Sequence, residues 1–141
     1  MESKGVIKNK IGLAALTAVL AANAANLLVW AVLKAVIGFD GQFQPLQAGP
    51  IAIFTTLGVA AAGLVYALTV RFAMRPIPTY RRIALAALVL SIIPNLGLMF
   101  NPAAAPFPGG SALNFGLLIL FHVVAAVAAV QVLIGMTRQK A

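Results

Sequence analysis

The sequence predicts an all-α integral membrane protein, an antiparallel four-helix bundle that forms a single domain over residues 1–141. Hydrophobic residues make up 62% of the chain and charged residues only 9%, whereas a soluble domain carries about 25% charged residues. Four apolar stretches are each long enough to supply the roughly 20 helical residues that cross the hydrocarbon core of a bilayer. The alternating pattern of a membrane β-barrel is absent from these stretches, so we expect helices.

The first span begins after a basic N-terminal arm. Ala22-Asn23-Ala24 resembles a signal-peptide cleavage site. The apolar stretch nevertheless continues to Ile37, which is too long for the core of a signal peptide. We therefore expect an uncleaved first span. The four expected spans are 11–38, 49–72, 83–100 and 111–136.

Pro and Gly residues mark the three connections between the spans, at 39–48, 73–82 and 101–110. The first and third connections are apolar and nearly uncharged, so we expect them to cap one end of the bundle. Pro94 lies inside the third span. It removes a backbone donor and is expected to kink that helix, with Ser91 available to soften the break.

The basic residues predict the orientation of the bundle. Nine of the ten Lys and Arg residues fall on one side of the four-span arrangement, and the positive-inside rule assigns that side to the cytoplasm. We therefore expect an inner-membrane protein with both termini in the cytoplasm. The net charge of +8 is then explained by topology, without a nucleic-acid partner. These nine residues are Lys4, Lys8, Lys10, Arg71, Arg75, Arg81, Arg82, Arg138 and Lys140.

The tenth basic residue, Lys34, lies near the outer end of the first span. It is expected to extend toward the interface beside Trp30. A weak ion pair with Asp40, and contact with an anionic headgroup or substrate, are the alternatives.

Polar residues within the spans are the candidates for function, because each needs a partner or a wet cavity in hydrocarbon. At about 1.5 Å per residue, Asn26, Ser91 and His122 fall roughly 14–18 Å below the outer boundary, near the midplane. One interpretation is that such residues hydrogen-bond across helices and stabilise the bundle. The other is that they line a ligand-binding cavity. The candidate ligand-binding residues are Asn23, Asn26, Ser91, Asn95 and His122.

The ligand of such a cavity stays open at this point. A neutral His122 is able to act as an axial ligand of a haem or chlorophyll-type tetrapyrrole, because one nitrogen is enough. It is equally able to hydrogen-bond a quinone carbonyl, and a lipid is a further alternative. No metal site built from several protein ligands is expected, because the chain has no Cys and a single His.

Small residues recur every four positions, which allows helices to pack closely. Ala14, Ala18 and Ala22 lead into Asn26 on the first span. Such faces serve packing within the bundle or association with another membrane subunit or a second copy, and packing within the bundle is favoured. The other small residues at this spacing are Gly58, Ala62, Ala125 and Ala129.

Catalysis is not expected. His122 lies near the midplane, whereas the two acidic residues, Glu2 and Asp40, lie on opposite sides of the membrane. A catalytic triad or a carboxylate pair cannot assemble from groups so far apart. The chain also lacks phosphate-binding and dinucleotide-binding glycine motifs.

Several short motifs together resemble an uncharacterised family of short four-span bacterial membrane proteins, a domain of unknown function. The motifs are Ala25-Asn26-Leu27-Leu28-Val29-Trp30, Gly49-Pro50, an arginine-rich middle turn, Ser91-Ile92-Ile93-Pro94 and Phe121-His122-Val123-Val124-Ala125-Ala126. The resemblance covers nearly the whole chain. It implies a four-span fold and marks Asn26, Pro94 and His122 as family positions, but it implies no activity.

The leading hypothesis from sequence is a non-enzymatic membrane protein that acts as an accessory or assembly subunit through its small-residue faces and outer connections. The alternative is a small-molecule binding or carrier protein with a His, Asn and Ser cluster at the midplane. A channel or transporter has no support beyond the fold, since the spans contain no acidic residue.

Overall fold

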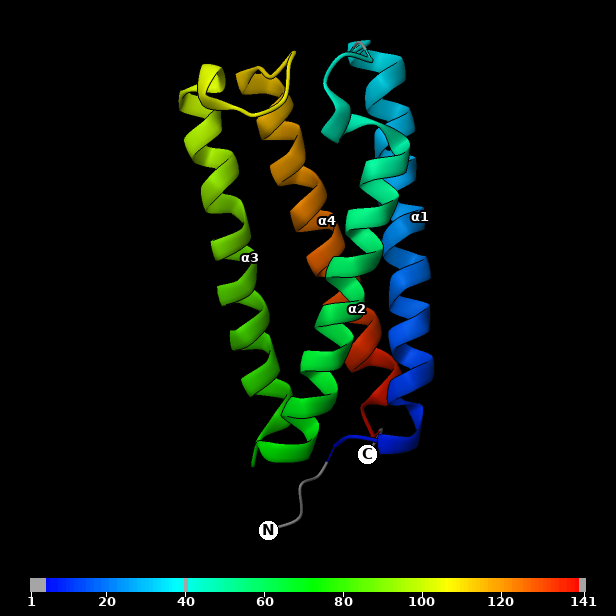
Figure 1. The fold of residues 1–141 in the computed structure, drawn as a ribbon. Coiled ribbons are helices and arrows are strands. Elements are labelled where there is room, and N and C mark those ends of the chain that lie inside the picture. Colours follow the sequence, from blue (N-terminus) through cyan, green and yellow to red (C-terminus); the bar gives the residue numbers. More distant parts are fainter. Residues whose placement is uncertain (1–4, 40, 140–141) are drawn as a thin grey trace.

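The computed structural model describes residues 5–39 and 41–139, and within them the chain forms four long helices (Figure 1). All of them are long and apolar enough to cross a bilayer, so the chain is a multi-pass membrane protein and the predicted helical fold is confirmed. The helices are α1 (Ile11–Ile37), α2 (Ala48–Phe72), α3 (Pro76–Phe100) and α4 (Ala112–Thr137), with short 3-10 turns η1 (Lys8–Lys10), η2 (Gln44–Leu46) and η3 (Pro102–Ala104).

The third helix is longer than the sequence indicated. It begins at Pro76 rather than near residue 83, so the connection from α2 shrinks to residues 73–75. Proline suits the first position of a helix, because the amide hydrogen that it lacks would have no partner there. The helix also continues through Pro94 without interruption.

Close packing of α1 against α2 and α4 organises the bundle. The expected internal use of small residues is confirmed at Ala14, Ala18 and Ala22, each 0% exposed. Gly63 of α2 is another point of close approach, where an added Cβ would lie 3.0 Å from the Cβ of Ala15. In contrast, α3 lies mainly against α4, and α2 and α3 diverge from their short connection (Figure 1).

The end of the bundle that holds both termini is tied together by polar contacts. The Tyr66 hydroxyl lies 2.6 Å from the Thr137 hydroxyl, which itself donates to the Leu133 carbonyl. The Ile7 amide donates to the Thr137 carbonyl at 2.7 Å. The segments before α1 and after α4 therefore pair with one another.

The opposite end is capped by the first and third connections, as predicted. Phe43 is buried and packs edge-on against Phe107 and Phe115, with ring centroids 6.5 Å and 5.2 Å away. The Trp30 indole donates to the carbonyl of Leu46 at 2.7 Å. These contacts fasten both connections onto the ends of the helices.

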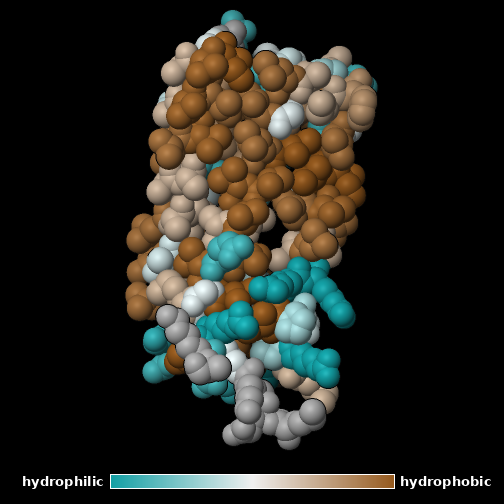
Figure 2. Space-filling model, turned by 180° about the vertical axis from the view of Figure 1, so that it is seen from behind, coloured by the Kyte–Doolittle hydropathy of each residue, from teal (hydrophilic) through white to brown (hydrophobic). Residues whose placement is uncertain are grey.

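Charge separates along the bundle axis. The basic residues that flank the short connection and the termini gather at one hydrophilic end, whereas the rest of the face shown in Figure 2 is mainly hydrophobic. Lys34 lies at the other end, with its ammonium 4.9 Å from the centroid of the Trp30 ring, an attractive cation–π contact. Lys4, Lys140 and Asp40, the alternative ion-pair partner of Lys34, lie outside the described residues.

Candidate functional site

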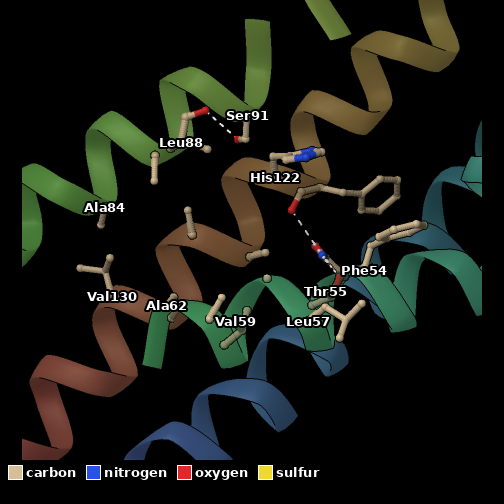
Figure 3. Close-up of a pocket in the computed structure, with 18 of the residues that line it drawn as sticks. Phe54, Thr55, Leu57, Val59, Ala62, Ala84, Leu88, Ser91, His122 and Val130 are labelled. Carbon is tan, nitrogen blue, oxygen red and sulfur yellow. Dashed lines mark hydrogen bonds between the residues drawn. The ribbon is translucent and has the colours of Figure 1, made fainter. Parts of the chain in front are cut away.

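A cleft of about 650 Å³ lies between α2, α3 and α4. In Figure 3, α4 forms its back wall, with Ser91 of α3 on one side and Thr55, Val59 and Ala62 of α2 on the other. The cleft opens sideways between α2 and α3, where Leu57 is exposed. This opening faces the direction in which lipid would surround the bundle.

Small side chains create much of this space. Where α2 and α3 diverge, the lining residues are too short to fill the gap, and a Cβ added at Gly58 would meet nothing within 4 Å. The sequence motif of repeated small residues therefore has two outcomes, close packing on α1 and an open cleft elsewhere. The small lining residues are Gly58, Ala61, Ala62, Ala84, Ala87, Ala125, Ala126 and Ala129.

Asn26 of α1 reaches the cleft and joins three helices. Its Nδ2 donates to the Thr55 hydroxyl of α2 at 2.9 Å and to the Phe121 carbonyl of α4 at 3.3 Å. The side chain is 1% exposed, and its Oδ1 has no hydrogen-bond partner among the described residues. The predicted interhelical hydrogen bonding is confirmed at this residue.

His122 of α4 lines the same cleft and is half-buried. Its Nδ1 lies 2.7 Å from the Leu118 carbonyl. A carbonyl only accepts hydrogen bonds, so in neutral imidazole the proton is on Nδ1 and the lone pair is on Nε2. The free nitrogen of this residue is therefore an acceptor or a ligand atom.

Ser91 of α3 also lines the cleft. Its hydroxyl donates to the Leu88 carbonyl at 2.7 Å, within its own helix (Figure 3). Ser91 and His122 thus hydrogen-bond to their own helices rather than across the bundle, unlike Asn26.

The structure brings together Asn26, Ser91 and His122 but not the other two predicted site residues. Asn23 donates to the Thr56 hydroxyl at 2.9 Å and to the Val19 carbonyl, and it does not line the cleft. Three residues turn a helix by about 300°, so the side chains of Asn23 and Asn26 point about 60° apart around the axis of α1.

Asn95 lies beyond the cleft on α3. Its Nδ2 donates to the Ser91 carbonyl at 3.4 Å, and it is not among the cleft-lining residues. Four residues after Ser91, it shares a helix face with it but sits about one turn further toward the capped end.

Sequence reasoning missed Thr55 and Tyr80 as site residues. Thr55 lay on the second span without a distinguishing motif, and its role depends on the Asn26 contact. Tyr80 was placed in the connection 73–82, but it belongs to α3 and lines the cleft. It is 1% exposed, its ring lies 4.7 Å from that of Tyr66, and its hydroxyl has no partner among the described residues.

The chemistry that the site offers is hydrogen bonding and coordination by one imidazole nitrogen. Within residues 5–39 and 41–139, no group of three or more His, Cys, Asp or Glu residues is placed to hold a metal ion. The walls are otherwise apolar.

Comparison with known proteins agrees with the predicted resemblance. No curated protein and no solved structure shows a significant match to the chain. A family model, described as a family of unknown function (DUF6069), matches residues 8–139 and so spans all of α1–α4. The chain therefore belongs to the DUF6069 family of unknown function.

Proposed function

We propose that the protein binds a small apolar molecule within the membrane, non-covalently, in the cleft between α2, α3 and α4. The observation that carries this proposal is the cleft itself, with its volume of about 650 Å³ and its polar groups at the inner wall. Ligand pockets commonly measure about 300–1,000 Å³ and combine apolar walls with a few polar groups. The sideways opening gives a membrane-dissolved molecule direct access.

Two cleft-lining residues carry buried polar atoms that are unpaired among the described residues, which supports binding further. The Oδ1 of Asn26 and the hydroxyl of Tyr80 lack partners among the described residues, and both residues line the cleft. An unpaired buried polar group costs about 1–3 kcal/mol. A ligand that pairs with either group would recover part of that free energy on binding.

Photolabelling in lipid vesicles tests the proposal. The probe is a hexadecanol that carries a diazirine on its chain, and labelled peptides are mapped by mass spectrometry. We expect labelling at cleft positions of α2, α3 and α4, and a large loss of it in Gly58→Leu, whose new side chain fills open space in the cleft. Gly135→Leu is the matched control, because Gly135 is also open to a side chain but lies outside the cleft.

Equal labelling of the cleft in Gly58→Leu and the unchanged protein would contradict the proposal. So would labelling that is spread evenly over all lipid-facing helix surfaces. Circular dichroism of each variant checks that the helices are retained.

An accessory or assembly role is a weaker alternative. It depends on small-residue faces and outer connections that are free to meet another subunit or a second copy. Ala14, Ala18 and Ala22 are instead buried within the bundle, and Phe43 packs into its cap. These surfaces are used within the chain, so binding is the better-supported proposal.

Tetrapyrrole binding is a second candidate, favoured by the His122 geometry. Histidines that bind metals usually donate their other ring N–H to a carbonyl or carboxylate, as Nδ1 of His122 does to Leu118. An absorption spectrum of the protein purified in mild detergent tests this idea. A Soret-type band that is lost in His122→Ala would support it, and a band that survives the substitution would exclude axial ligation by this residue.

We also propose that the hydrophilic end, with both termini, lies in the cytoplasm and that the membrane is the plasma (inner) membrane. The support is the basic residues at this end together with the positive-inside rule. The chain has no native Cys, so in a single-cysteine variant the maleimide labels only the introduced thiol. A membrane-impermeant maleimide applied to intact cells should label Ala104→Cys and not Met74→Cys. The reverse pattern would invert the topology.

A further inference from the structure

The orientation of the Asn26 amide determines what the inner wall of the cleft offers. Its side-chain nitrogen and oxygen differ in hydrogen-bonding role, and the atom that faces the Phe121 carbonyl must be the nitrogen, because a carbonyl cannot donate. The two amide hydrogens then serve Phe121 and Thr55. What remains is Oδ1, a buried acceptor without a partner among the described residues.

His122 and Ser91 offer acceptors as well. The Nδ1 hydrogen of His122 is directed to Leu118, which leaves the lone pair of Nε2. The hydroxyl hydrogen of Ser91 is directed to Leu88, which leaves the oxygen lone pairs. Three polar side chains from three helices therefore line one cleft, and each of them retains an acceptor after its donors have been used within the chain.

Thr55 adds a complementary donor at the same place. Its oxygen accepts from Asn26, and among the described residues no hydrogen bond uses its own hydroxyl hydrogen. A ligand group that both donates to Asn26 Oδ1 and accepts from Thr55 would match the wall. A hydroxyl group has both capacities.

The rest of the cleft is long and apolar. Its lining on α2 runs from Pro50 to Val65, which at 1.5 Å per residue is about 22 Å along the helix. No charged residue is among those that line it, so a charged headgroup would meet no counter-charge there. Space of this shape suits a chain or an elongated ring system rather than a compact polar molecule.

We propose that the ligand of the cleft is a long apolar alcohol, whose hydroxyl donates its single hydrogen to one of the acceptors that Asn26, His122 and Ser91 retain. This inference rests on the proposed function and specifies its substrate class. It disfavours ketones, esters and quinones, because an acceptor-only headgroup has no hydrogen to donate to any of these acceptors. It also disfavours carboxylate anions, which would face the acceptors with a negative charge.

Competition on the unchanged protein tests the headgroup without risk to the fold. The diazirine hexadecanol labels the cleft in vesicles, while 1-hexadecanol, 1-methoxyhexadecane or 2-hexadecanone competes. We expect the ether and the ketone to compete at least about tenfold more weakly than the alcohol, which corresponds to about 1.4 kcal/mol. Equal potency of all three would overturn the alcohol inference and leave the proposed binding function intact.

The two proposals fail in different ways. If the label never concentrates in the cleft and no Soret-type absorption band is present, or if Gly58→Leu leaves the label there, the binding function itself is wrong. If the alcohol and its analogues do not compete but a Soret-type absorption band is present, a tetrapyrrole occupies the cleft and the alcohol inference is overturned.

Substitutions then locate the acceptors. Of His122→Phe and Asn26→Leu, the variant that removes the acceptor in use should reduce the preference for the alcohol over the ether by several-fold. Making both variants keeps the test available if one of them fails to fold. Asn23→Leu is the matched control, because Asn23 also has an unpaired Oδ1 but lies outside the cleft, and it should keep the full preference. An unchanged preference in folded His122→Phe and Asn26→Leu would overturn the assignment of these acceptors.

Discussion

Replacing Asn26 with Ala tests the hydrogen bonds that join α1 to α2 and α4. The substitution removes both interhelical bonds, to Thr55 and to the Phe121 carbonyl. Each such bond contributes about 0.6 kcal/mol on average and at most about 1.7 kcal/mol in a membrane. Because two bonds are lost, we expect the free energy of unfolding to fall by about 1–3 kcal/mol. Asn23→Ala is the matched control, because it removes a single interhelical bond, to Thr56.

The comparison of these two variants isolates the extra bond. Both substitutions also delete an unpaired Oδ1, so any gain from removing that atom largely cancels between them. Reversible unfolding in mixed micelles, followed by circular dichroism, gives each free energy of unfolding. We expect Asn26→Ala to be less stable than Asn23→Ala by at least about 0.6 kcal/mol. Equal or reversed stabilities would refute the claim that Asn26 joins three helices.

Two further pairs of variants are measured in the same unfolding assay. Gly63→Ala should destabilise the protein by about 1 kcal/mol or more, because its Cβ would lie 3.0 Å from that of Ala15. Gly58→Ala is the control, because its Cβ would meet open space and should leave the stability unchanged. Equal stabilities of the two variants would count against the close contact of α1 and α2. Tyr66→Phe should cost about 0.5–1.5 kcal/mol, because it deletes a 2.6 Å bond to a buried threonine of α4. Tyr80→Phe should cost nothing, because the Tyr80 hydroxyl has no partner among the described residues, and a larger loss in Tyr80→Phe would contradict this assignment.

Hydrophobicity and helix length were enough to predict the spans. The apolar stretches needed no tertiary information, because backbone groups in lipid must be paired within helices. Depth along the axis was also predictable, since each helical residue rises by about 1.5 Å. For this reason Asn26, Ser91 and His122 were expected at one level, and they do line one cleft.

Rotation about the helix axis was harder to predict. Asn23 was a candidate for the same site as Asn26, yet it meets Thr56 outside the cleft, because a difference of three residues leaves the two side chains about 60° apart. Tyr80 was missed for a different reason, since proline residues that looked like a connection are the start of α3. The cleft itself depends on how far α2 and α3 diverge, which follows from packing of the whole bundle.

An experimental density map of the protein in lipid nanodiscs tests the central claim most directly. We expect elongated density between α2, α3 and α4, with a polar end about 2.7–3.2 Å from Oδ1 of Asn26 or Nε2 of His122. The same density should be absent in Gly58→Leu. A map in which α3 closes against α2 and leaves no space for a ligand would show that the cleft is not a binding site.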